Sequence, residues 1–153
     1  MDNKNFKKIF GEIAKQHSFE PAFGGWFRES GECIVILYLQ KSNFGNRYYF
    51  YIKTYVHGLF NDHYEKSKSL VINNLYAILW GVPNQYHYLF HLNDPIDDNE
   101  RTEKIKKVFD EEVVPYINKA LTLEGIRQLS QEYPHLLSSA YRKQLNEKFQ
   151  LGV

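Results

Sequence analysis

The stretch CIVILYLQKSNFGNRYYFYIKTYVH, residues 33–57, gives the clearest indication of the fold class. It holds two runs rich in β-branched and aromatic residues, 33–42 and 48–57, joined by the polar connection 43–47. Runs of this composition favour β-strands, and a short connection containing Gly and Asn is typical of an antiparallel hairpin. We therefore expect a β-hairpin at the centre of the fold.

The residues that form the turn leave two registers of this hairpin open. A two-residue Gly45-Asn46 turn has Gly first, as a type II′ turn requires, and it pairs Val35 with Val56. A five-residue loop slips the pairing by one residue and moves one strand's side chains to the opposite face. We favour the tight turn because it keeps the most apolar sets together, and it predicts a positive φ at Gly45.

The residues that precede the hairpin predict a helix and a short strand. Residues 3–17 carry apolar side chains at positions i, i+3 and i+4, which places them on one helical face. Asp2 or Asn3 is expected to cap this helix. Residues 26–29 form a short strand, so the sheet begins before the central hairpin.

The middle of the chain is harder to interpret. Residues 59–70, which include Asn61 and Asp62, are polar and predict a loop. Residues 71–80 are apolar and fit either a strand or a helix, whereas the residues that follow alternate between two sets with period two. The simplest interpretation is a second hairpin, about 72–80 with 85–92.

The remainder of the chain predicts helices. An apolar stripe runs from 105 to 121, and Pro115 inside it predicts a kink or a break just before it. Thr122 is expected to cap a short helix to residue 133, and a last amphipathic helix follows over 136–149. We expect one α+β domain, residues 1–153. It has an N-terminal helix, an antiparallel sheet of about four to five strands built from hairpins, and C-terminal helices on one sheet face.

Residues 39–50, LQKSNFGNRYYF, carry the most distinctive motif of the chain. The motif resembles the family named domain of unknown function 4304, in which a strand ending in a Leu-Gln-Lys-Ser-like motif leads through a short loop to an aromatic strand. The later helix with Val114-Pro115 also fits, and the resemblance covers most of 5–130. Residues 59–92 show no counterpart of the family's middle segment. The resemblance implies an α+β fold and no particular activity.

Composition excludes several classes of protein. Lys and Arg number 19 and Asp and Glu 18, so the net charge of +1 lacks the basic excess of most nucleic-acid-binding proteins. The longest apolar run, 34–39, is far shorter than a membrane span, and the N-terminus has no apolar signal region. Cys33 is the single cysteine, which excludes an internal disulfide. We expect a soluble, cytoplasmic protein that binds neither membranes nor nucleic acid.

The sequence gives little support for a metal site or for a catalytic cysteine. His87 and His91 have a spacing that suits a metal on a helix, but on the expected strand they lie about 13 Å apart. Cys33 begins an apolar strand and has no base or cation near it in sequence, so we expect a buried, unreactive thiol. We therefore expect neither a metal nor a cofactor.

Four acidic residues cluster before the long C-terminal helix, and they are expected to cap it. Carboxylates favour helix N-termini because of the free backbone amides and the helix dipole there. The cluster lacks the spacing and the Gly of a calcium loop. Its members are Asp94, Asp97, Asp98 and Glu100.

Five polar or aromatic side chains alternate along the second strand of the hairpin and therefore share one face. With neighbours on the first strand they form the candidate site: Tyr38, Gln40, Tyr49, Tyr51, Lys53, Tyr55 and His57. Three interpretations compete, namely a core face covered by helices, a partly open face that binds a protein, and tyrosines that stack on bases or a planar ligand. The opposite set, from Phe50 to Val56, is more apolar and is expected to face the core.

The leading functional hypothesis is a non-enzymatic module that binds a protein or a ligand through this face or the hairpin tip. Its partner would be another protein or a second copy of the chain, and a toxin-masking immunity protein is one form, by fold-level analogy alone. The alternative is an enzyme that acts on a small molecule with Lys53, Tyr55 and His57 as acid and base groups. A deep pocket beside this trio would favour the enzyme.

Overall fold

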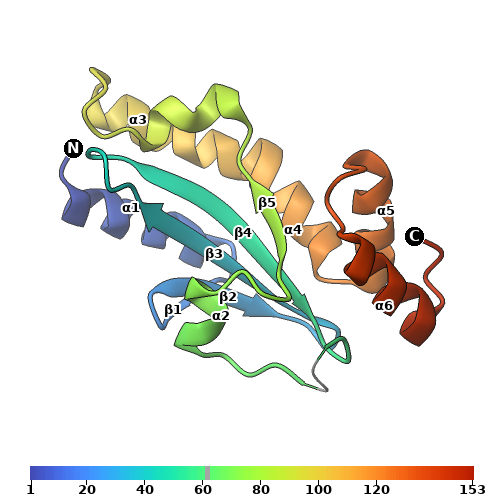
Figure 1. The fold of residues 1–153 in the computed structure, drawn as a ribbon. Helices are drawn as coiled ribbons and strands as arrows, with labels where there is room; N and C mark the ends of the chain where they lie inside the picture. The colour runs from blue at the N-terminus through green and yellow to red at the C-terminus, as the bar shows by residue number, and fades with distance from the viewer. Residues whose placement is uncertain (61–62) are drawn as a thin grey trace.

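A computed structural model describes residues 1–60 and 63–153, in which an antiparallel sheet is surrounded by helices (Figure 1). Within these residues five strands lie in the order β1-β2-β3-β4-β5, so each pairs with its neighbour in the chain. The strands are β1 (Glu20–Ala22), β2 (Gly25–Glu29), β3 (Cys33–Lys41), β4 (Tyr48–Val56) and β5 (Ile78–Gly81). The predicted α+β fold is confirmed.

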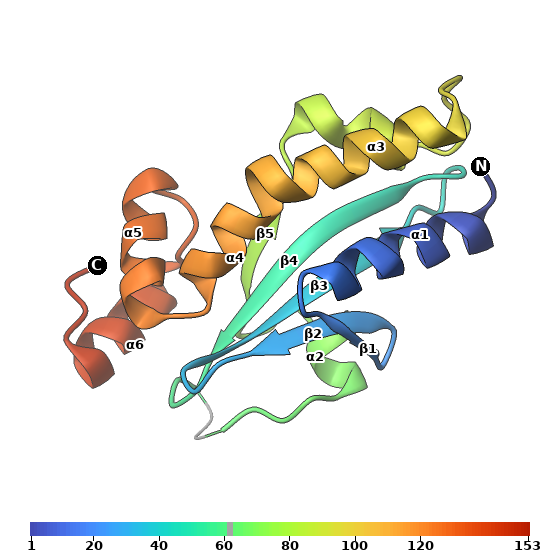
Figure 2. The same ribbon diagram turned by 180° about the vertical axis from the view of Figure 1, so that it is seen from behind.

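Helices cover one face of the sheet and one of its ends. Figure 2 shows α1, α3 and α4 lying across one face, with α5 and α6 beyond the end of β4. The α-helices are α1 (Asn3–Gln16), α2 (Lys68–Ile72), α3 (Asp98–Val108), α4 (Val114–Ala120), α5 (Leu123–Glu132) and α6 (Ser139–Phe149). A 3₁₀ helix, η1 (Asn84–Phe90), and a π-helical turn, η2 (Phe109–Val113), complete the set.

The N-terminal helix begins where its cap residue predicts. The Asp2 side chain accepts a hydrogen bond of 2.7 Å from the backbone N–H of Asn5, which satisfies one free amide of the first turn. The apolar stripe of α1 is buried against the sheet, with Phe6 and Phe10 fully covered. The predicted helix over 3–17 is confirmed.

The central hairpin has the predicted faces but not the predicted turn. Val35 pairs with Thr54 rather than Val56, so the register differs by two residues from the tight turn. The Ser42 hydroxyl accepts from the backbone N–H of Phe44 at 3.1 Å, and the Ser42 N–H donates to the Arg47 carbonyl at 3.0 Å. Because a shift of two preserves side-chain alternation, the two faces are unchanged. Gly45 has the expected positive φ, +145°.

The second hairpin predicted over 72–80 and 85–92 is wrong. Only Ile78–Gly81 is a strand there, and it pairs with β4, whereas residues 84–90 form η1. The residues of this stretch fit two patterns. Their period-two alternation predicts a strand, but Tyr86, Leu89 and Phe90 also have the i, i+3, i+4 spacing of one helical face. The buried guanidinium of Arg101 accounts for the outcome, since it donates to the carbonyls of Tyr88 (3.3 Å) and Leu89 (2.6 Å) at the end of η1.

The polar segment 59–70 is mostly irregular, as predicted, except that α2 begins at Lys68. Asn61 and Asp62, which belong to the predicted loop, lie outside the described residues. The side chain of Ser67 caps α2 by accepting from the Leu70 N–H at 3.3 Å. The ambiguous stretch 71–80 thus divides between the end of α2 and the start of β5.

The long C-terminal helix changes its winding just before Pro115, as the sequence predicts. The α3 helix passes into the π-helical turn η2, and α4 then continues with Pro115 in its first turn. Proline has no N–H to donate to the fourth residue before it, so a local change in winding is the expected response. Asp97 and Thr122 cap α3 and α5, and the last helix begins at Ser139 because Ser138 caps it.

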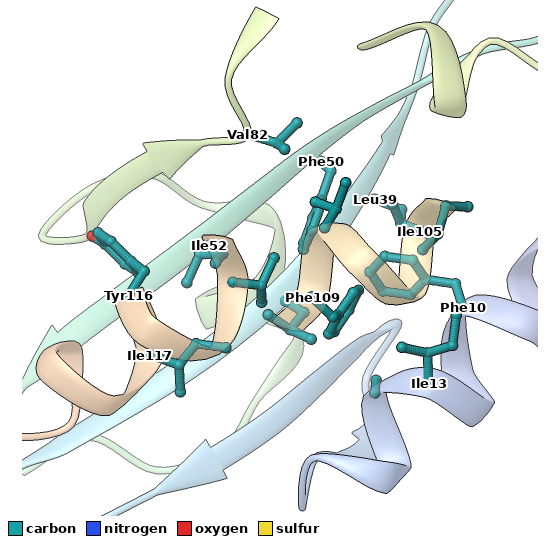
Figure 3. Packing of buried hydrophobic residues seen from close by; sticks show 14 of the residues in the cluster. Phe10, Ile13, Leu39, Phe50, Ile52, Val82, Ile105, Phe109, Tyr116 and Ile117 are labelled. Carbon is teal, nitrogen blue, oxygen red and sulfur yellow. The ribbon is translucent and has the colours of Figure 1, made fainter. Parts of the chain in front are cut away.

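The largest core lies between the sheet and the helices α1, α3 and α4 (Figure 3). Phe50 projects from β4 between Phe10 and Phe109, with ring centroids 5.0 Å and 5.9 Å away. A second core lies at the end of the sheet where β3 begins and β4 ends, and it joins this end to α5 and α6. Phe50, Ile52, Thr54 and Val56 are all buried, as expected for the core side of β4.

The opposite face of the sheet is covered over part of its length by residues 64–77, which we call the α2 segment (Figure 1). Tyr64 and Val71 of this segment pack on Ile34, Ile36 and Tyr55 of the sheet. No helix in the described part of the chain has the length and apolar character needed to cross a membrane.

Candidate functional site

The candidate residues of β3 and β4 do lie on one sheet face, but they meet two different environments. Tyr38 pairs with Tyr51 and Gln40 with Tyr49, so these four form one end of the face. Gln40 and Tyr49 are exposed and Tyr51 is half-buried. Lys53 and Tyr55 lie further along β4, and each is only 1% exposed beneath the α2 segment.

The ammonium group of Lys53 is bound within the fold. Its Nζ donates to the backbone carbonyls of Val71 and Asn73, the latter at 3.2 Å, and lies 4.6 Å from the ring centroid of Tyr38. These carbonyls are at the C-terminal end of α2, where free acceptors and the helix dipole favour a cation. Burial lowers the pKa of Lys53 to about 8.

The hydroxyl of Tyr55 binds the same turn of the chain. It donates a proton to one carbonyl at a time, and the Leu70 and Asn73 oxygens lie 2.7 Å and 3.0 Å away. Burial, and then the neighbouring Tyr64, raise the pKa of Tyr55 to about 12. Lys53 and Tyr55 together therefore act as the C-terminal cap of α2 and hold the α2 segment on the sheet.

His57 has a separate structural contact at the start of that segment. Its Nδ1 accepts a hydrogen bond of 3.2 Å from the backbone N–H of Tyr64, and its ring stacks on His63 at 4.2 Å. Burial, and then the proximity of His63, lower the pKa of His57 against the opposing effect of Glu29. The three groups of the enzyme hypothesis thus bind backbone groups of the fold rather than converging on a common cavity.

The open end of the face borders a groove of about 480 Å³ between β4 and the turn after β5. Tyr49 is 37% exposed and stacks on Tyr51 at 6.5 Å, while the guanidinium of Arg47 lies 6.0 Å from the Tyr49 ring. The groove is lined by Tyr49, Phe50, Tyr51, Gly81, Val82, Pro83, Asn84 and His87. It presents aromatic surface with polar edges, a combination that suits recognition of another molecule.

The cysteine and the acidic cluster that the sequence analysis singled out both have structural roles. Cys33 is fully buried and burial raises its pKa to about 12, which matches the expected unreactive thiol. Asp97 accepts from the backbone N–H groups of Asn99 (3.0 Å) and Glu100 (3.2 Å), so one member of the acidic cluster caps α3, while Asp98 and Glu100 lie in its first turn. No cluster of potential metal ligands occurs among the described residues.

Sequence reasoning missed the residues that form the far wall of the groove. The expected hairpin of 72–80 with 85–92 makes residues 81–84 only its turn and places His87 on a strand, whereas the structure places His87 on η1. His87 Nε2 lies 2.9 Å from the Val82 carbonyl, which fixes its ring across this wall. The Gly-Val-Pro-Asn sequence was the available signal, since such a turn brings backbone close to a neighbouring strand.

Comparison with known protein families identifies the family of this chain. The sequence model of the family described as "Domain of unknown function (DUF4304)" matches residues 10–119. The chain belongs to the DUF4304 family. The match runs from α1 through α4 and includes residues 59–92, for which the sequence motifs gave no counterpart. It therefore contains the whole DUF4304 sheet, the α2 segment and the groove.

No curated protein and no solved structure matches the chain.

Proposed function

We propose that this DUF4304 protein is a non-enzymatic interaction module that binds a protein partner through the open end of the sheet face. The contact surface consists of Gln40, Tyr49 and Tyr51 together with the groove wall at residues 81–84 and His87. Tyrosine is enriched at protein interfaces because it combines a rigid apolar ring with a polar tip.

The observation that carries this proposal is the division of the β4 face. Lys53 and Tyr55 are occupied by carbonyls of the α2 segment, whereas Tyr49 and Tyr51 have no such cover and border the groove. Tyr49 is exposed and Tyr51 is half-buried beside it, so the pair presents aromatic surface at the border of the groove, and binding of a partner is the role that we propose for this surface.

The alternative enzyme role has less support. An acid or base group must reach a substrate, and the side chains of Lys53 and Tyr55 are each 1% exposed. The groove lies beside the tyrosines and His87, at the other end of the face from His57. We therefore assign the open end a binding role and no catalytic step.

The test compares affinity-tagged wild type with a Tyr49→Ser/Tyr51→Ser double variant in a lysate of the source organism. We expect the double variant to lose the specific partner that the wild type retains, as measured by quantitative mass spectrometry. Tyr88→Ser is the matched control, because Tyr88 is similarly exposed (39%) but lies outside this surface.

Sedimentation velocity on the same three proteins tests whether the partner is a second copy. A wild-type dimer that becomes monomeric only in the double variant would identify self-association. Identical captured proteins and identical sedimentation for all three would contradict the proposal.

A further inference from the structure

A small cleft lies on the helical side of the molecule, between η2 and α4 on one side and α5 on the other. Its volume is about 80 Å³, and the groups that form it include Glu112 from η2, Tyr116 and Lys119 from α4, and Glu132 and Tyr133 from α5. The cleft shares none of its lining residues with the groove at the open end of the sheet face.

One of the residues that line this cleft carries an unsatisfied hydroxyl group. Tyr116 is only 3% exposed and its ring stacks on Trp80 with centroids 4.5 Å apart. Figure 3 shows its hydroxyl oxygen directed away from the apolar cluster. Among the described residues this buried oxygen has no hydrogen-bond partner. Buried polar groups are almost always paired, so this hydroxyl indicates a missing ligand or solvent partner.

The lining of the cleft carries a net negative charge. It holds three carboxylates, Glu111, Glu112 and Glu132, and one lysine, Lys119, which lies 3.3 Å from Glu132. Lys107 lies 3.8 Å from Glu111, so Glu112 is the carboxylate of the cleft that has no lysine partner among the described residues. Tyr86 donates to Glu112 at 3.2 Å, which fixes that carboxylate without neutralising it. Burial, and then the negative charges of Glu132 and Glu112, raise the pKa of Tyr133.

We propose that this cleft binds a guanidinium group. A guanidinium is planar, so it can lie against the Tyr133 ring while its N–H groups donate to Glu112, Glu132 and the Tyr116 oxygen. A cleft of about 80 Å³ admits such a head group but not a larger molecule. The guanidinium belongs either to a free small compound or to an arginine side chain of a polypeptide.

The test titrates the folded protein with N-acetyl-arginine methylamide and with its neutral citrulline analogue, followed by ¹H–¹⁵N NMR. We expect saturable shifts of the backbone amides of residues 111–116 and 129–133. The affinity for the citrulline analogue should be lower by about tenfold or more, because this analogue lacks the charge that assists the hydrogen bonds. Added salt should weaken the arginine probe by screening.

Variants locate the site. Glu112→Gln and Glu132→Gln should each weaken the arginine probe by about tenfold, whereas Glu147→Gln removes the same charge from exposed α6 and should leave affinity unchanged. Tyr116→Phe should raise the melting temperature of the free protein, because it removes an unsatisfied buried hydroxyl, yet it should reduce the affinity.

The source of the guanidinium is distinguished by comparing methylguanidinium with the peptide Ala-Arg-Ala. Tighter binding of the peptide identifies an arginine of a polypeptide, and tighter binding of methylguanidinium identifies a free compound. Equal binding of the arginine and citrulline probes, or wild-type affinity in both Gln variants, would overturn the proposal.

Discussion

Lys53 and Arg101 are two buried cations that bind backbone carbonyls. Lys53 binds the end of α2, and Arg101 binds the end of η1 and also the Asp94 carbonyl at 3.1 Å. Both satisfy acceptors that a helix end leaves free, in a position where the helix dipole favours positive charge. Each residue therefore helps to fix a connecting segment, together with buried apolar side chains such as Val71 of α2 and Phe90 of η1.

Lys53 predicts a specific pH dependence. Its folded-state pKa, about 8, is below its ordinary value of 10.5, so the cost of burying the charge is fully present below pH 8. Between these two values the unfolded state binds more protons than the folded state, and stability rises with pH. The free energy of unfolding of the wild type should therefore increase relative to Lys53→Met between about pH 7.5 and pH 9.5, as measured by urea denaturation. A constant difference would contradict the assignment.

Arg101 predicts a large loss of stability on substitution. Arg101→Met leaves the carbonyls of Tyr88, Leu89 and Asp94 without their donor, which should cost about 3 kcal/mol or more of unfolding free energy in urea. Arg127→Met is the control, because Arg127 pairs with Glu124 on the surface of α5 and its substitution should change stability little. Equal effects of the two substitutions would show that the buried contacts add nothing.

Local sequence determines the elements better than it determines their pairing. The helices α1 and α5 begin at their predicted caps because capping depends on residues three or four apart. The hairpin register depends on the Ser42 hydroxyl and on pairing of the loop with residues 91 and 92, which the strand pattern does not contain. The local pattern of residues 84–90 does not predict η1 for a similar reason. The guanidinium that binds the end of η1 belongs to Arg101, which lies well after these residues in the chain.

The junction between α4 and α5 depends on a glycine. A Cβ atom at Gly125 would overlap the backbone carbonyl of Lys119, whereas a Cβ at Gly31 would meet nothing within 4 Å. Gly125→Ala should therefore lower the free energy of unfolding by about 2 kcal/mol or more, and Gly31→Ala should change it little. Thermal unfolding monitored by circular dichroism compares the two variants, and equal melting temperatures would contradict the close packing of this junction.

At the scale of the whole molecule, the order of elements in the chain explains why the sheet face is divided. The helices α1, α3 and α4 lie across one face, and the α2 segment covers only part of the other (Figures 1 and 2). Period-two alternation predicted which side chains of β4 share this face. It could not predict which of them are covered, because Lys53 and Tyr55 are buried by carbonyls of Leu70, Val71 and Asn73. These residues lie where the predicted loop 59–70 meets the stretch 71–80, which fits either a strand or a helix.

The stability of four single variants tests this division most directly. In urea denaturation, Tyr49→Ser and Tyr51→Ser should each lower the free energy of unfolding by less than about 1 kcal/mol, because these side chains lie at the open end. Tyr55→Ser and Lys53→Met should each cost about 2 kcal/mol or more, because they uncap α2 and open space under its segment. If Tyr49→Ser and Tyr51→Ser prove as costly as Tyr55→Ser, the tyrosines at the open end are part of the core, and the surface proposed for binding does not exist.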